Sequence, residues 1–205
     1  MIAKKGLLVK WKPIYKDEYN NIGDIVNYLM LVNKDNLVDR TYIPDDLVNS
    51  NSMYRDNILV NKKVLKMFNL MKKEASKLNY NIDIMSGYRD YYYQEKIYNK
   101  LVKEMGLNYA FRYIAMPGAS EHQTGLAIDI CIYRSDKAYV EKQLTDFEEI
   151  AWLEQNAHRF GFILRYPKDM EDVTGYNYEP WHFRYVGNKA SYLYYNDLVL
   201  EEYLL

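Results

Sequence analysis

Apolar residues recur at two different spacings along this chain, and each spacing predicts a different kind of element. Between residues 64 and 78 they return every three or four positions, as on one face of an amphipathic helix. That face consists of Val64, Phe68, Met71, Ala75 and Leu78. Residues 82–86, Ile-Asp-Ile-Met-Ser, follow as a predicted short strand.

A second helix is predicted between Asp90, which can cap its first turn, and Gly106, which ends it. Its apolar positions recur every four residues at Tyr93, Ile97, Leu101 and Met105. Further along, Thr145 and Glu148 have the spacing of a capping box, which predicts the start of a third helix. That helix is expected to end near Gly161.

Two later segments alternate with the two-residue period of a strand. Within residues 126–132 the leucine and the isoleucines point one way, whereas Asp129 points the other way between two small neighbours. Residues 181–186 alternate as well and place His182 on the face opposite its aromatic neighbours. Residues 162–166 form a further predicted strand after the third helix.

The order of these elements predicts the fold class. Strands and helices are interspersed and no glycine-rich nucleotide-binding turn occurs, which favours an α+β domain with an antiparallel sheet flanked by helices. Residues 1 to about 50 are expected to be irregular, with 42–48 as a strap over the surface, and the tail 189–205 is expected to be helical. We therefore divide the chain into an N-terminal extension, residues 1–28, and one domain, residues 29–205.

Composition narrows the class of protein. The chain has 205 residues, of which 49% are hydrophobic and 27% charged, which is typical of a globular domain. A net charge of -1 gives no broad electrostatic footprint for nucleic acid. The single cysteine, Cys131, excludes a disulfide framework and a cysteine-rich zinc site. No apolar stretch approaches the length of a membrane span or of a signal sequence. A cytoplasmic location is expected for the chain as written, and a cell-surface one if it belongs to a longer exported protein.

The most informative polar residues are a histidine and an aspartate around residue 125. His122 lies on a turn just before Gly125, and Asp129 lies inside the strand that follows. An aspartate in an isoleucine-rich strand needs a partner, because an unpaired buried carboxylate costs several kcal/mol. A turn followed by a strand can bring both side chains to one point. From these residues alone, metal ligation and a hydrogen-bonded core aspartate remain open alternatives.

A second segment supplies another histidine and a spare carboxylate. Glu179 and His182 flank Pro180, which prevents a helix and shapes a fixed turn into the strand. Two imidazoles and one carboxylate leave a fourth position open on zinc, and a carboxylate beside it can act as a base. The two segments together favour a zinc-dependent hydrolase. Among the chain's three histidines, His158 has no such carboxylate neighbours, and we interpret it as a half-buried structural residue.

Several segments resemble the VanY-type zinc D,D-carboxypeptidases, a family that includes bifunctional VanXY enzymes and L,D-carboxypeptidases of the LdcB type. The resemblance covers roughly residues 30 to 205. Its motifs are Ser-Gly-Tyr-Arg-Asp at 86–90, Gln94, Pro-Gly-Ala-Ser-Glu-His-Gln-Thr-Gly-Leu-Ala-Ile-Asp at 117–129, Gly-Phe-Ile-Leu-Arg-Tyr-Pro at 161–167, and Thr-Gly-Tyr-Asn-Tyr-Glu-Pro-Trp-His-Phe-Arg-Tyr-Val-Gly at 174–187. The resemblance implies the zinc D,D-peptidase fold, which Hedgehog signalling domains share.

The resemblance also implies roles for individual residues. It implies one zinc ion per chain held by His122, Asp129 and His182, with Glu179 as the catalytic carboxylate. It implies that Arg89 binds the terminal carboxylate of the substrate, with Gln94 and Ser120 as further partners. The role of Arg89 agrees with its chemistry, because a guanidinium offers a carboxylate a two-pronged, permanently charged match. Ser120 as a nucleophile is disfavoured, since no glycine elbow or base accompanies it.

We therefore expect a zinc carboxypeptidase that releases the C-terminal D-Ala from peptidoglycan stem peptides or their precursors. An L,D-carboxypeptidase and a bifunctional D,D-dipeptidase/carboxypeptidase are the alternatives within this class. A zinc-stabilised binding module without activity is the alternative outside it. Arg184, which shares a strand face with His182, is expected either to hold carboxylates of the site or to form a surface ion pair.

Overall fold

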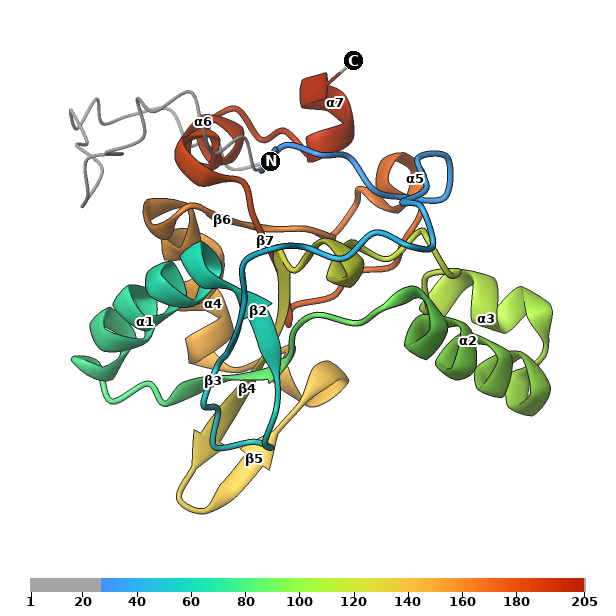
Figure 1. Ribbon diagram of the computed structural model, residues 1–205. Helices are drawn as coiled ribbons and strands as arrows, with labels where there is room; N and C mark the ends of the chain where they lie inside the picture. The colour runs from blue at the N-terminus through green and yellow to red at the C-terminus, as the bar shows by residue number, and fades with distance from the viewer. Residues whose placement is uncertain (1–26, 205) are drawn as a thin grey trace.

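The structure is a computed structural model that describes residues 27–204. The predicted extension, residues 1–28, thus lies almost wholly outside the described residues. Within the described part, helices pack on an antiparallel sheet (Figure 1). The expected α+β fold is therefore confirmed. No helix in residues 27–204 is both long and apolar enough to cross a membrane.

The main sheet has five strands in the order β3-β4-β7-β6, with β5 paired to β4. These strands are β3 (Ile82–Ser86), β4 (Ala127–Arg134), β5 (Lys137–Tyr139), β6 (Phe162–Leu164) and β7 (His182–Tyr185). Every neighbouring pair is antiparallel. The pairing of β4 with β7 matters most for function, because it sets Asp129 directly opposite His182.

Helix α1 (Lys62–Ser76) and helix α4 (Glu148–Asn156) bury their apolar residues in one core with the sheet. The predicted face of α1 is confirmed for Val64, Phe68, Met71 and Ala75, which are buried. Leu78 lies beyond the end of the helix and is 51% exposed, so its place in that face was wrong. The isoleucines of β4 point into the same core. The opposite face of β4 and β7 is left for polar side chains.

The start of α4 differs from the predicted capping box. The residue that caps the helix is Phe147, and the Thr145 hydroxyl instead donates to the carbonyl of Lys142 at 3.1 Å. Thr145 follows a short 3-10 helix, η2 (Glu141–Leu144), and so lies before Phe147, too early in the chain to cap α4. A second 3-10 helix, η3 (Ala157–Phe160), continues α4 up to Gly161, as expected.

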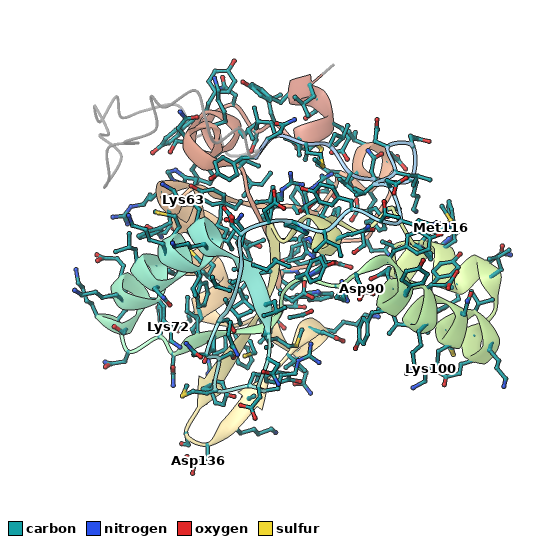
Figure 2. All side chains as sticks on the ribbon, in the orientation of Figure 1. Lys63, Lys72, Asp90, Lys100, Met116 and Asp136 are labelled. Atoms are coloured by element: carbon teal, nitrogen blue, oxygen red, sulfur yellow. The ribbon has the colours of Figure 1, made fainter. Side chains whose placement is uncertain are left out.

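Helices α2 (Tyr91–Met105) and α3 (Leu107–Tyr113) form an arm beside the body of the protein (Figure 1). Asp90 caps α2 through the amide of Tyr93, and in Figure 2 it lies at the base of the arm with Lys100 farther along it. The predicted apolar face is wrong, since Tyr93 is 45% and Met105 is 54% exposed. The residues of α2 that are buried are Gln94 and Tyr98. A helix that stands away from the sheet buries only a narrow stripe.

The segment before α1 is more ordered than the predicted strap. Residues Leu47–Asn49 form strand β1, which pairs with β2 (Leu59–Asn61) in a separate two-stranded sheet. The amide of Asn61 donates to the carbonyl of Gly125 at 3.0 Å. This small sheet therefore lies directly against the turn that carries His122.

The C-terminal tail forms two short helices rather than one long helix. They are α6 (Ala190–Tyr195) and α7 (Leu200–Leu204), and η4 (Gly187–Lys189) precedes them. The break falls at Asp197, whose φ of 57° lies in the left-handed region and cannot continue a helix. One further short helix, α5 (Glu171–Thr174), lies before β7.

Candidate metal centre

His122 is positioned by a 3-10 helix and by contacts with the backbone of Gly87 and Arg89. It lies in η1 (Glu121–Thr124), which ends at Gly125 with a φ of 69°. The His122 Nδ1 atom lies 2.6 Å from the carbonyl oxygen of Gly87, and the Arg89 amide donates to the His122 carbonyl at 3.2 Å. Gly87 admits no side chain, because a Cβ there would lie 2.2 Å from the Leu59 carbonyl oxygen. The imidazole therefore presents its Nε2 atom toward β4.

Asp129 lies between the two histidines, and each of its carboxylate oxygens faces one imidazole nitrogen. Its Oδ2 atom lies 3.2 Å from His122 Nε2, and its Oδ1 atom lies 3.0 Å from His182 Nδ1. The two imidazole rings meet edge to face, with centroids 4.9 Å apart. All three side chains are buried, and one ligand atom from each lies within 4.8 Å of the others. We call His122, Asp129 and His182 the metal group.

The donor set of the metal group fits zinc. Ligands about 2.0–2.1 Å from a tetrahedral zinc ion are about 3.3 Å apart, close to the separations of 3.0 and 3.2 Å seen here. Within the described residues, His122 Nε2 is buried and has no hydrogen-bond partner. Burial and the Arg89 guanidinium lower the pKa of His122 to about 4, so its neutral form can donate a lone pair. Nitrogen and oxygen ligands that converge away from solvent are what a divalent cation requires.

Glu179 lies beside the metal group without belonging to it. Its Oε2 atom lies 3.7 Å from His182 Nδ1, and its side chain is 19% exposed. The amide of His182 donates to the Glu179 carbonyl at 3.2 Å, which fixes the turn that Pro180 shapes. Burial raises the pKa of Glu179 to about 7, a value suited to proton transfer near neutral pH.

One cavity of about 320 Å³ brings most of the predicted residues together. Its lining includes the metal group, Glu179, Arg89 and Ser120. Arg89 forms no ion pair with the neighbouring Asp90, whose carboxylate caps α2 instead. Within residues 27–204 the Arg89 side chain has no acidic partner, so its guanidinium is available to a ligand.

Gln94 does not line this cavity. It is 1% exposed, and its Nε2 atom donates to the carbonyl of Ala115 at 2.7 Å. Ala115 does line the cavity, so Gln94 supports the wall from behind. The structure thus separates Gln94 from the other predicted site residues.

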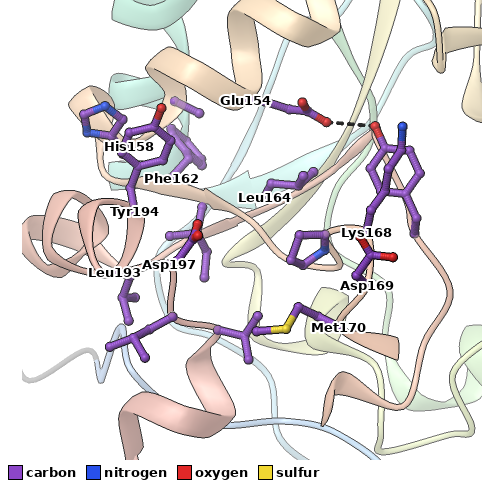
Figure 3. Close-up of a pocket in the computed structure, with 16 residues that line it drawn as sticks. Glu154, His158, Phe162, Leu164, Lys168, Asp169, Met170, Leu193, Tyr194 and Asp197 are labelled. Carbon is purple, nitrogen blue, oxygen red and sulfur yellow. Dashed lines mark hydrogen bonds between the residues drawn. The ribbon is translucent and has the colours of Figure 1, made fainter. Parts of the chain in front are cut away.

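A second cavity, of about 490 Å³, lies along β6 between α4, α6 and the segment before α5 (Figure 3). It contains His158, which is buried rather than half-buried and stacks on Tyr194 with ring centroids 4.1 Å apart. Its Nδ1 atom lies 3.1 Å from the Ser191 hydroxyl. Glu154 in this cavity accepts a hydrogen bond from the Tyr178 hydroxyl, as Figure 3 shows. The interpretation of His158 as structural agrees with these contacts.

The motif analysis missed Glu121, which lies directly beside His122 and is 1% exposed. Its Oε1 atom accepts from Arg165 Nε and Arg184 Nη1, each at 2.7 Å. Arg165 also makes a two-pronged contact with Glu201 of α7, at 2.8 and 2.6 Å. We call these four residues the ion network. Arg184 therefore holds a carboxylate, the first of its two expected roles. The sequence signal was an arginine inside each of two predicted strands, residues 162–166 and 181–186.

Burial opposes the ionisation of Glu121, but the guanidinium groups of Arg165 and Arg184 outweigh this effect. They hold the pKa of that carboxyl well below its usual range. Burial also disfavours charged Arg165, yet Glu121 and Glu201 keep its pKa above the usual value. Glu121 and Arg165 are consequently both charged at neutral pH.

A metal-binding group, a carboxylate beside it and an arginine without an acidic partner among residues 27–204 share one cavity, as in a metallopeptidase site. Residues 57–188 match the family model of the VanY D-alanyl-D-alanine carboxypeptidases. The chain is 39% identical to the candidate carboxypeptidase YodJ of Bacillus subtilis, over 91% of this chain and 70% of that protein. It is 36% identical to the bifunctional D-Ala-D-Ala dipeptidase and carboxypeptidase VanXYC of Enterococcus gallinarum, over 79% and 85%. The chain belongs to the VanY family.

Solved structures agree with this assignment. The LD-carboxypeptidase LdcB superposes with a TM-score of 0.81 and 40% identity, over 87% of this chain and 86% of that one. A glutamate-to-alanine variant of the D,D-pentapeptidase VanY in complex with Zn(II) superposes with a TM-score of 0.74 and 34% identity, over 87% and 99%. VanYB in complex with D-alanine-D-alanine superposes with 0.73 and 34%, over 86% and 97%. The expected enzyme class is confirmed. The similarities disfavour the alternative of a zinc-stabilised binding module without activity.

Proposed function

We propose that this carboxypeptidase releases the C-terminal D-Ala from peptidoglycan stem peptides, or from precursors that end in D-Ala-D-Ala. The observation that carries the proposal is the single cavity that holds the metal group, Glu179 and Arg89. A carboxypeptidase must recognise a free terminal carboxylate and place the adjacent peptide bond at its reactive groups. A relative in complex with D-alanine-D-alanine supports the choice of ligand.

In this mechanism His122, Asp129 and His182 hold one zinc ion. When bound, zinc acts as a Lewis acid on the scissile carbonyl and makes water acidic enough to attack near neutral pH. Glu179 accepts a proton from the attacking water and then delivers it to the leaving amine. Its raised pKa, about 7, suits both transfers.

Arg89 orients the substrate. Its guanidinium forms a two-pronged, charge-assisted contact with the terminal carboxylate, which holds the leaving residue in the cavity. Ser120, 3% exposed and on the cavity wall, offers a further hydrogen bond. Gln94 does not contact the substrate in this mechanism; its amide instead donates to the Ala115 carbonyl and so supports the cavity wall.

An L,D-carboxypeptidase is the second candidate. The similarity to LdcB, at 40% identity and a TM-score of 0.81, exceeds that to the two VanY structures described above. The metal group and Glu179 serve either stereochemistry, because both reactions hydrolyse a peptide bond next to a terminal D-Ala. The choice depends on how the cavity walls fit the residue before the scissile bond.

Mass spectrometry of the products tests both candidates. The zinc-loaded protein is incubated with a stem pentapeptide that ends in D-Ala-D-Ala and, separately, with a tetrapeptide that ends in a single D-Ala. Release of D-Ala from the pentapeptide with arrest at the tetrapeptide supports the D,D proposal. Cleavage of the tetrapeptide alone overturns it in favour of the L,D candidate. Free D-Ala-D-Ala as a third substrate detects dipeptidase activity.

Three controls complete this experiment. A chelator should abolish release from every substrate, and readdition of zinc should restore it. Metal analysis should find one zinc ion per chain. A pentapeptide with an amidated C-terminus should be a poor substrate, because it removes the charge that Arg89 is proposed to bind. The cytoplasmic or cell-surface location stays a prediction, testable by fractionation of cells that express the native gene.

A further inference from the structure

Glu121 connects the ion network to the metal group. We infer that Glu121 is a positioning residue, whose carboxylate holds the imidazole of His182 by its Nε2–H and so leaves Nδ1 as the metal-binding nitrogen. This inference rests on the proposed role of the metal group, but not on which peptide bond is cut. It assigns a function to a buried carboxylate that the mechanism above does not use.

The two atoms face each other. Glu121 Oε2 lies 3.7 Å from His182 Nε2, about half an ångström beyond an N–H···O hydrogen bond. Both residues are buried, at 1% and 4% exposure, and within the described residues neither atom has a hydrogen-bond partner. A small rotation of the imidazole therefore satisfies two buried polar atoms at once.

The other nitrogen of His182 faces the metal side of the ring. His182 Nδ1 lies 3.0 Å from Asp129 and 3.7 Å from Glu179, and both carboxylates belong to the lining of the cavity. Glu121 lies at the opposite end of the ring. A proton on Nε2 keeps the lone pair of Nδ1 free for a cation, since a neutral imidazole carries only one proton.

His122 shows the same division of its two nitrogens. Its Nδ1 atom contacts the Gly87 carbonyl at 2.6 Å, and its Nε2 atom points at Asp129 from 3.2 Å. A carbonyl can only accept, so Nδ1 carries the proton and Nε2 is left for the metal. Each histidine thus has one nitrogen for the cation and one for a protein acceptor that fixes the tautomer.

The ion network keeps Glu121 in place for this task. Its Oε1 atom is fully used by Arg165 and Arg184, which leaves Oε2 for the histidine. Arg165 is itself held by Glu201 of α7, and Arg184 donates to the carbonyls of Tyr28 and Met30 at 3.1 and 2.7 Å. The carboxylate therefore has a fixed position, set by contacts from both ends of the described chain.

Glu121→Gln tests the inference. The amide oxygen can still accept from the arginines, but its NH₂ group then faces His182 Nε2 and donates to it. This favours the tautomer with the proton on Nδ1, the nitrogen that the metal needs. Zinc affinity, measured by competition with a chelator, should fall about 10–100-fold. Glu201→Gln is the matched control, because it weakens the same network without touching His182. Its zinc affinity should equal that of the parent.

Nitrogen-15 NMR of labelled histidines in the unaltered, zinc-loaded protein gives a second readout that a merely structural role does not predict. We expect His182 to be protonated at Nε2 and zinc-bound at Nδ1. The reverse assignment overturns the inference even if Glu121→Gln fails to fold, and so do equal losses of affinity in the two variants. A His182→Ala protein that keeps full zinc affinity would instead remove the ligand set on which the proposed function depends.

Discussion

Two buried groups of charged and polar side chains lie side by side in this protein, and they differ in how their polar atoms are paired. In the ion network two arginines meet two glutamates, and Glu121 Oε1 and both oxygens of Glu201 are matched to guanidinium N–H donors at 2.6–2.8 Å. In the metal group two imidazoles converge on one carboxylate, with one ligand atom from each side chain within 4.8 Å of the others. The arginines of the network pair with carboxylates and with the carbonyls of Tyr28 and Met30, whereas all three side chains of the metal group line the cavity.

The difference separates structural charge from functional charge. Buried ions are tolerated where each is paired and hydrogen-bonded, as in the network. Burying several metal-ligating atoms together costs free energy, and this cost can be offset by the free energy of metal binding. Glu121 belongs to both groups, since one of its oxygens faces the arginines and the other faces His182. The network therefore acts as the foundation of the metal group.

Removal of the metal should have the largest effect on activity. We expect His122→Ala to lose zinc and all measurable release of D-Ala, because the variant keeps only two ligands. Elemental analysis of the purified protein and the product assay check this together. Unchanged zinc content in the variant would contradict the assignment of His122 as a ligand. Chelated parent protein serves as the reference for complete loss.

Glu179→Gln should leave zinc in place and remove the proton acceptor. We expect kcat to fall about 10²–10⁴-fold, the usual contribution of a positioned acid–base group. In the parent, the acid limb of kcat/KM should lie at or below pH 7, since burial raises the pKa of Glu179 to about 7 and a bound cation lowers it. The rate falls as pH drops because the protonated carboxyl cannot accept a proton. A variant with near-normal kcat would exclude Glu179 from this role.

Arg89→Lys should weaken recognition of the terminal carboxylate. Lysine keeps the charge but loses the planar fork, so we expect kcat/KM to fall about 10-fold for free peptides. Amidated peptides, which the parent uses poorly, should be affected little. Equal losses for free and amidated substrates would show that Arg89 acts on the fold of the cavity rather than on the carboxylate.

The residues of the metal group could be found from the sequence for a physical reason. An aspartate and a histidine each lie in a strand rich in large apolar residues, and a polar side chain in such a strand marks a buried group that needs a partner. Residues 126–132 and 181–186 showed this clearly. Strand periodicity also predicted which face of its own strand each residue occupies, and the pairing of β4 with β7 then set Asp129 opposite His182.

The ion network and the arm could not be found in this way. The partners of Glu121 lie 44 and 63 residues away along the chain, and only the register of β6 and β7 brings them together. For α2, apolar spacing predicted a face that packs on the sheet, but the helix stands beside it and buries Gln94 and Tyr98. Periodicity reports which face is apolar, and tertiary packing decides which face is covered.

Arg165→Met should separate stability from catalysis. The variant leaves Glu121 and Glu201 buried with fewer partners, and breaking such a pair costs about 3–5 kcal/mol of unfolding free energy. Urea unfolding of the zinc-free protein measures this cost. Lys77→Met is the control, because it removes an exposed ion pair with Glu74 and should leave stability unchanged. A loss no larger than that of the control would show that the network contributes nothing to stability.

His158→Gln should have the smallest effect on activity, and it tests whether the larger cavity takes part in the reaction. The His158 ring packs on Tyr194, and its Nδ1 atom meets Ser191, in a cavity whose lining shares only Tyr178 with that of the metal group. We expect kcat/KM and zinc content to stay at the parent values, with a loss of about 1 kcal/mol in unfolding free energy from the weakened packing. The product assay and urea unfolding are run on the same preparation. A tenfold fall in kcat/KM at full zinc content would mean that the second cavity is coupled to the first. The contrast between a functional and a structural histidine would then fail.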